Sequence, residues 1–315
     1  MLGEGPAITP THLMTTTAMI HPVPQDATPV ETRANLRSLS RRSRSMLLAA
    51  LLLAVLLVIW QSLVSRPAGA GNAVDPEYAA LMGKASTGGS ALPSPMEVGR
   101  TLIKHLQSPF AYPGTKQPGI AVHLAYSIGR VLLGFGLAVM VAVPLGFVVG
   151  MFPTLHGALD PFIQVLKPVS PLAWLPLALY TIKDAQLSSI FVIFICSIWP
   201  TLLNTAFGVS RVRQEWLNVA RTLEVGRARL VRRVLLPAAL PTILAGMRIS
   251  IGIAWLVIVA AEMLVGGTGI GYFIWNEWNN LQIANIIVAI LVVGCVGVVL
   301  DGLLAMVGRR FTYAE

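Results

Sequence analysis

The chain has 315 residues, of which 55% are hydrophobic and 12% are charged, with a formal net charge of +9. Its mean hydropathy of +0.71 places it among membrane proteins that cross the bilayer several times, outside the range of ordinary soluble domains. The arginines flank apolar runs, which is the charge bias of the cytoplasmic side of a membrane protein, so the basic charge does not indicate nucleic-acid binding.

The N-terminal part of the chain divides at the first apolar run. Residues 1–45 lack hydrophobic periodicity and are rich in Thr, Pro and Ser, which predicts a disordered, basic cytoplasmic tail. Residues 46–65 are nearly uncharged and close to the roughly 20 residues that span a bilayer, so they predict a first transmembrane helix. A signal peptide cleaved near Ala68–Ala70 is the alternative, but the run is longer than the roughly 7–15 residues of a signal core.

Residues 66–119 form a polar, Gly- and Pro-rich segment that we expect on the periplasmic side, with helical spacing from 96 to 106 predicting one surface helix. We expect residues 120–310 to form the main transmembrane domain. Its further apolar runs, which bring the expected number of membrane helices to about six, are 121–151, 160–182, 187–207, 240–265 and 283–307. Glycines along the first of these runs predict close packing inside the bundle, since small residues let membrane helices approach.

The run 160–182 contains four prolines, so a regular helix cannot pass through it. Broken backbone at membrane depth survives only where protein or a water-filled cavity satisfies its polar groups. We therefore predict that this run lines a pathway, with Trp174 and Tyr180 as wall residues. An ordinary kinked helix with aromatic residues anchored at the membrane interface is the alternative.

The segment 211–237 is a polar, arginine-rich island between two apolar runs. Apolar residues recur at helical spacing on both sides of Gly226. We expect the helix to be interrupted at Gly226, because glycine adopts turn conformations at little energetic cost. Pro237 and Pro241 then mark the start of the next apolar run. This pattern predicts two short amphipathic helices on the membrane surface that lead into a transmembrane helix, and a solvated basic loop is the alternative.

The basic regions fix the expected topology. They are the N-terminal tail, the segment 211–237 and the pair Arg309 and Arg310 after the last run. All three lie on one side of the membrane if the number of spans is even. By the positive-inside rule that side is the cytoplasm, so we expect both termini there, in a bacterial inner (plasma) membrane.

Among the ionisable residues at or near membrane depth, we single out Arg130, Arg248 and Glu262. Charges there are costly and usually face the bundle interior or a cavity. Arg130 or Arg248 is a candidate to attract an anion in a translocation pathway. For Arg248 the favoured alternative is an extension of its side chain to the cytoplasmic interface. Glu262 would repel anions, so we expect it to serve a structural hydrogen bond or a gate.

Two stretches of the domain resemble a known family. Residues 218–237 resemble the cytoplasmic coupling loop of ABC-importer permeases, with the pattern E-A-A, three residues, G, nine residues and I-x-L-P. Asn218 stands where the family has Glu, and Glu224 stands where it has Gly. The resemblance implies that the ATPase contacts are made by Asn218, Val219, Ala220, Arg221, Thr222, Leu223, Glu224, Gly226, Leu236 and Pro237.

The second stretch begins with the glycine cluster 266–271 and continues through the aromatic residues of 272–280. This cluster lacks the GxGxxG register of a nucleotide site, and the aromatic residues predict a short helix at the periplasmic interface. Together with residues 260–265 the stretch resembles permeases for nitrate, nitrite and cyanate. Permeases for bicarbonate share much of it, and those for taurine and alkanesulfonates share the glycines.

The resemblance implies an all-α membrane bundle with the type I ABC importer permease fold. It also implies a second copy of the permease, cytoplasmic ABC ATPase subunits and a periplasmic substrate-binding protein as partners. The expected function is to form the translocation pathway for a small inorganic anion. The resemblance favours nitrate, with bicarbonate or taurine and alkanesulfonates as alternatives.

The sequence contains none of the motifs HExxH, GxSxG or a Walker A lysine loop, so we expect a non-catalytic subunit. ATP and Mg²⁺ would be bound by the partner ATPase, and no cofactor by this chain. The histidines are scattered, and Cys196 and Cys295 lie in apolar runs, which indicates buried thiols and no metal site. An ATP-independent secondary transporter and a membrane-anchored assembly protein are the alternatives from other classes.

Overall fold

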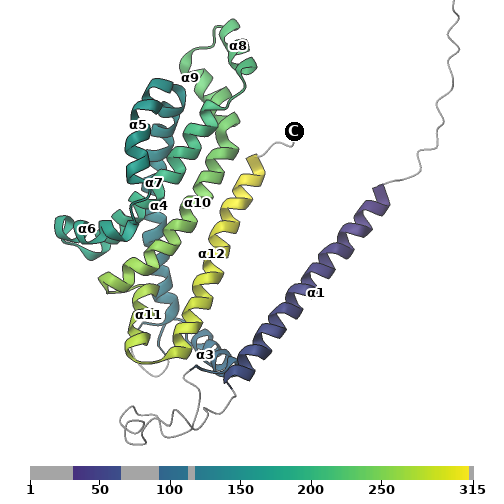
Figure 1. The fold of residues 1–315 in the computed structure, drawn as a ribbon, viewed down its shortest axis with the longest axis vertical. Coiled ribbons are helices and arrows are strands. Elements are labelled where there is room, and N and C mark those ends of the chain that lie inside the picture. The colour runs from purple at the N-terminus through teal and green to yellow at the C-terminus, as the bar shows by residue number, and fades with distance from the viewer. Residues whose placement is uncertain (1–30, 65–91, 113–117, 312–315) are drawn as a thin grey trace, which may run out of the picture. The chain divides into compact units, whose positions relative to one another are not determined.

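The computed structural model describes residues 31–64, 92–112 and 118–311, and it divides into two compact units, residues 1–59 and 60–315. The described residues are helical apart from short connections and one isolated bridge between Ala111 and Pro118. The helices are α1 (Glu31–Val64), α3 (Pro95–Gln107), α4 (Ile120–Met151), α5 (Pro153–Leu166), α6 (Trp174–Ile182), α7 (Ala185–Ser210), α8 (Gln214–Thr222), α9 (Arg227–Leu230), α10 (Leu236–Val265), α11 (Ile270–Asn279) and α12 (Ile283–Phe311) (Figure 1).

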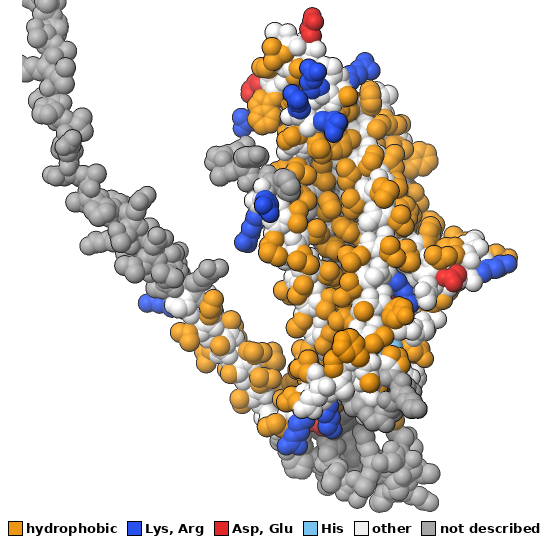
Figure 2. Space-filling model, turned by 180° about the vertical axis from the view of Figure 1, so that it is seen from behind, with side chains coloured by type: hydrophobic (Ala, Val, Ile, Leu, Met, Phe, Trp, Pro, Cys, Tyr) orange, Lys and Arg blue, Asp and Glu red, His pale blue; other side chains and the backbone are white. Residues whose placement is uncertain are grey.

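Five of the described helices are long and apolar enough to cross a membrane, and the bent pair α5 and α6 makes a sixth if it counts as one crossing. The prediction of an all-α membrane bundle with about six spans is therefore confirmed. Hydrophobic side chains cover the sides of the bundle, while Lys and Arg side chains gather at the end that carries α8 and α9 (Figure 2).

Helix α1 begins at Glu31, so residues 31–45, which we expected in a disordered tail, are helical. Residues 1–30 and the possible cleavage site at 68–70 lie outside the described residues. From Ser43 to Val64 almost every side chain of α1 is exposed, and the segment is strongly apolar. This helix therefore has a surface suited to lipid or to another protein.

Helix α7 lies at the centre of the bundle, packed against α4 on one side and α10 on the other. Three of the glycines of α4 explain how closely it approaches α7. A Cβ atom added at Gly134, Gly146 or Gly150 would lie 2.6–2.8 Å from atoms of α7, whereas Gly129 and Gly136 face open space. The predicted close packing thus depends on three of the five glycines.

Buried hydroxyl groups join α7 to α10. Thr201 and Ser250 form a 2.7 Å hydrogen bond, and Ser250 donates to the carbonyl of Ser197 at 2.8 Å. Helix α12 is tied to α10 by the indole N–H of Trp255, which donates to the carbonyl of Val293 at 2.9 Å. These bonds satisfy polar groups inside the membrane region and fix the neighbours of α10.

The proline-rich run breaks as predicted. Helix α5 ends at Leu166, a 3-10 turn occupies Pro171–Ala173, and α6 follows at an angle of 79° to α5. Pro171 and Pro176 occupy first-turn positions, where a missing N–H leaves no intrahelical bond unmade. Lys183, with φ of 58°, ends α6 in the left-handed region.

Candidate functional site

Helix α8 of the arginine-rich segment ends in a Schellman motif. The N–H of Val225 donates to the carbonyl of Ala220 at 3.0 Å, and the N–H of Glu224 donates to Arg221 at 3.0 Å. Glu224 has a φ of 48°, in the left-handed region that favours glycine. This conformation explains why a glycine suits this position in the coupling-loop pattern, and the bend survives here with a glutamate.

The break does not depend on Gly226, contrary to our expectation. Gly226 has an ordinary φ of −58°, and a Cβ atom there would meet nothing within 4 Å. The second predicted helix is also not separate, because α9 continues through a π-helical turn, Val231–Leu235, into α10. The π-helical turn lies just before Pro237. Proline has no backbone N–H, so Pro237 cannot donate the usual helical hydrogen bond to the carbonyl of Arg233.

An apolar groove of about 490 Å³ lies between α8 and the start of α10. It is lined by Trp216, Val219, Ala220, Leu223, Val225, Arg233, Val234, Pro237 and Ala238. Val219 and Leu223 are 59% and 70% exposed, while Ala220 is buried. Of the other predicted contact residues, Asn218, Arg221, Thr222, Glu224, Gly226 and Leu236 lie outside the groove lining.

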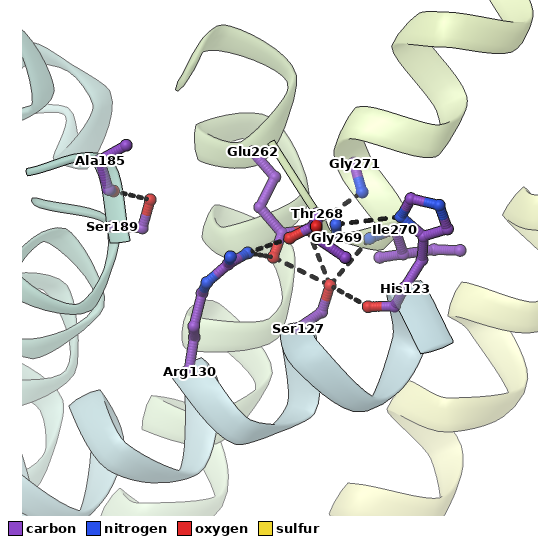
Figure 3. Close-up of polar contacts among 10 residues, drawn as sticks. All are labelled: His123, Ser127, Arg130, Ala185, Ser189, Glu262, Thr268, Gly269, Ile270 and Gly271. Carbon is purple, nitrogen blue, oxygen red and sulfur yellow. Dashed lines mark hydrogen bonds and ion pairs between the residues drawn. The ribbon is translucent and has the colours of Figure 1, made fainter. Parts of the chain in front are cut away.

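The opposite end of the bundle contains a buried ion pair (Figure 3). Arg130 of α4 donates from Nη1 to Oε1 of Glu262 in α10 at 2.6 Å, and to the carbonyl of Thr268 at 2.6 Å. The hydroxyl of Ser127 lies 2.7 Å from Oε2 of Glu262. Arg130 and Glu262 have side-chain exposures of 8% and 1%.

The glycine cluster after α10 wraps around this pair. The N–H of Gly271 donates to Oε2 of Glu262 at 3.1 Å, the N–H of Ile270 donates to Ser127 Oγ at 2.9 Å, and the N–H of Gly269 donates to His123 Nδ1 at 3.1 Å (Figure 3). A Cβ atom at Gly269 would overlap the Glu262 carboxylate, and one at Gly271 would overlap the carbonyl of Val259. The glycines are needed for close approach to a buried carboxylate.

These contacts bear on the roles expected for the two residues. Arg130 and Glu262 pair with each other and are almost fully enclosed, which favours a structural role, and a contact of either residue with a transported anion stays a prediction. The structural hydrogen bond expected of Glu262 is present. Arg248 pairs with Asp301 of α12 through two hydrogen bonds, a partner that the sequence analysis did not foresee.

The bent segment faces a cavity of about 270 Å³ that it shares with α7 and α10. Trp174 lines this cavity together with Trp199 of α7 and Ile253 of α10. Tyr180 is 81% exposed and lies outside the cavity lining. The structure thus brings one of the two predicted wall residues to a cavity and leaves the other on the surface.

Sequence reasoning missed a polar cluster between α3, α11 and α12. Tyr112 donates to Oε2 of Glu277 at 3.1 Å, and the amide of Asn285 donates to the same oxygen at 2.5 Å. His105 contacts Asn285 at 3.2 Å. Burial, followed by the charge of Glu277, raises the pKa of Tyr112 to about 12. The available signal in the sequence was Glu277, which lies between Trp275 and Trp278. The sequence did not indicate this cluster, because Tyr112 and His105 are distant from Glu277 along the chain.

In the described part of the chain no group of three or more His, Cys, Asp or Glu side chains is arranged to hold a metal ion.

A family model described as "Binding-protein-dependent transport system inner membrane component" matches residues 138–313. A solved structure of the MetNI methionine ABC transporter in inward-facing conformations has a TM-score of 0.54 at 11% identity, covering 61% of this chain and 95% of that one. This likeness concerns the fold alone.

Sequence matches to individual permeases cover most of the chain. A nitrate import permease protein of Synechocystis sp. is 41% identical over 266 residues, which cover 84% of this chain and 89% of the relative. A bicarbonate transport system permease protein of Synechococcus elongatus is 40% identical over 230 residues, covering 71% and 82%. The chain therefore belongs to the family of inner-membrane components of binding-protein-dependent transport systems, a class of non-catalytic, multi-pass membrane proteins.

Proposed function

We propose that this chain is the permease subunit of an ATP-driven importer for a small inorganic anion, and that the anion is nitrate. Members of the family function with ATPase and binding-protein partners. The observation that supports nitrate is the match to nitrate import permeases at 41–46% identity. Bicarbonate permeases match at 40–43%, so the choice between the two anions rests on the uptake experiment below.

Two copies of the chain would form the pathway, because the cavity beside the bent segment measures only about 270 Å³ within a single bundle. The groove between α8 and α10 would receive an apolar projection of the ATPase, since Val219 and Leu223 expose large apolar side chains there. The π-helical turn joins this groove directly to α10, so movement of α8 would be transmitted to a membrane helix.

The substrate is tested by uptake of labelled nitrate, bicarbonate and taurine in cells that lack the gene. We expect loss of nitrate uptake alone and its return with the wild-type gene. Loss of bicarbonate uptake alone would retain the ATP-driven permease and reject nitrate. Uptake that continues after depletion of ATP, with the ion gradient intact, would reject the ATP-driven mechanism in favour of a secondary transporter.

The coupling groove is tested with Val219→Asp and Leu223→Asp, which place a charge in the apolar lining without disturbing buried Ala220. We expect both variants to lose co-purification of the ATPase and at least tenfold in uptake. Gln214→Glu is the matched control, because it adds a negative charge at an exposed first-turn position of α8 outside the groove. ATPase association that survives both groove variants would reject this docking site.

A further inference from the structure

Helix α10 has one face that its neighbours leave uncovered, which we call the open face of α10. Its residues lie on one side of the helix and are Pro241, Ala245, Arg248, Ile249, Gly252, Ile253 and Leu256. At one edge, Ile253 lines the cavity beside the bent segment. At the other edge, Arg248 pairs with Asp301 of α12. The ion pair therefore shares a continuous surface with the cavity that the broken backbone borders.

The pair lies at membrane depth. Arg248 is about 18 Å along the axis from Leu236, and Asp301 is about 15 Å from the end of α12, at 1.5 Å per residue. The side chains remain 44% and 50% exposed in the single chain. Charges facing hydrocarbon are costly, so this surface must be covered by water or by protein when the chain is in the membrane.

The geometry of the pair leaves part of the guanidinium free. Arg248 donates from Nε to Oδ1 of Asp301 at 2.9 Å and from Nη2 to Oδ2 at 2.6 Å. An arginine has five N–H donors, so Nη1 and the outer hydrogen of Nη2 remain. Within the described residues, no hydrogen bond uses Nη1. These donors lie in one plane, a geometry that suits two oxygens of one small oxyanion.

We propose that Arg248 is an anion-contacting residue of the translocation pathway, facing the water between two copies of the chain, with Asp301 as its permanent counter-ion. This inference rests on the proposed function. The ligand is a small monovalent oxyanion held by the free edge of the guanidinium. Asp301 balances the charge of Arg248 when no anion is bound. It also weakens the attraction between Arg248 and the anion, which is necessary because a transported ion must be released again.

The competing explanation is a structural pair that only joins α10 to α12. The double variant Arg248→Gln/Asp301→Asn separates the two, because Gln and Asn can keep a side-chain hydrogen bond while both charges are removed. We expect it to assemble with the ATPase at wild-type levels and to lose at least tenfold in nitrate uptake. The variant Asp301→Asn alone keeps the arginine and removes its counter-ion, so we expect half-saturation at a lower nitrate concentration.

Wild-type uptake by the double variant would overturn the anion contact and leave the proposed function standing. If the wild-type chain restores uptake of neither nitrate nor bicarbonate, the proposed function fails and this inference fails with it. Gly252→Cys in a Cys295→Ser background tests the aqueous face without changing the charges, since a Cβ atom at Gly252 meets nothing within 4 Å. We expect rapid reaction with a charged thiol reagent in the assembled transporter, and no reaction would overturn the inference.

Discussion

The two arginine–carboxylate pairs between membrane helices have the same shortest distance and opposite surroundings. Arg130–Glu262 and Arg248–Asp301 both measure 2.6 Å, but the first pair has side-chain exposures of 8% and 1% and the second 44% and 50%. The buried carboxylate also accepts from a hydroxyl and a backbone N–H, whereas the exposed one accepts from its arginine alone within the described residues. Surroundings, and not the distance, separate a structural pair from one available to a solute.

The largest expected effect follows from breaking the buried pair. Arg130→Met leaves the Glu262 carboxylate buried without its cation, which costs about 3–5 kcal/mol when one partner of a buried pair is removed. We expect a strong decrease in the thermal midpoint and in the yield of folded protein in detergent. Arg130→Met/Glu262→Gln should recover much of this loss, because no buried charge remains. A single variant as stable as wild type would show that the pair does not stabilise the fold.

The next effect concerns the glycines around Glu262. A Cβ atom at Gly271 would overlap the carbonyl of Val259, and overpacking of this kind costs about 1–3 kcal/mol. We expect Gly271→Ala to lower the thermal midpoint clearly. Gly252→Ala is the control, since a Cβ atom there meets nothing within 4 Å. Equal midpoints for the two variants would contradict the role assigned to the glycine cluster.

A smaller effect is expected at the polar cluster of Tyr112 and Glu277. The pKa of Tyr112 is raised from 10.0 to about 12, so the folded protein keeps a proton that the unfolded chain loses. This contribution to stability is complete below pH 10 and is lost as the pH rises toward about 12. We expect the midpoint of the wild type to fall more steeply over this range than that of Tyr112→Phe. Parallel pH profiles would exclude this coupling.

The smallest effect on stability is expected at the exposed pair. Arg248→Gln/Asp301→Asn removes a pair whose side chains are 44% and 50% exposed and leaves no unpaired charge, so we expect no measurable change in the thermal midpoint in detergent. The same variant should lose uptake, which separates function from folding at this pair. A decrease in midpoint as large as that of Arg130→Met would show that the two pairs stabilise the protein alike.

Local sequence signals predicted the helices well. Uninterrupted apolar runs gave α4, α7, α10 and α12, because roughly 20 apolar residues suffice to span a bilayer. Four prolines predicted the break between α5 and α6, since proline disfavours helix interiors, although one of the four, Pro161, lies inside α5. The helix start at Glu31 was missed, because basic and polar residues carry no apolar periodicity. The bend after α8 was placed at Gly226, although the left-handed residue is Glu224.

The sequence by itself determined the membrane class, the approximate spans and the family, because composition and short motifs are local properties of the chain. Only the tertiary structure decided which charges compensate one another. Arg130 and Glu262 are 132 residues apart, and Arg248 and Asp301 are 53 apart. No local pattern encodes such pairs, since they depend on the packing of α4, α10 and α12. That packing buries the paired Arg130 and leaves the side chain of the paired Arg248 44% exposed.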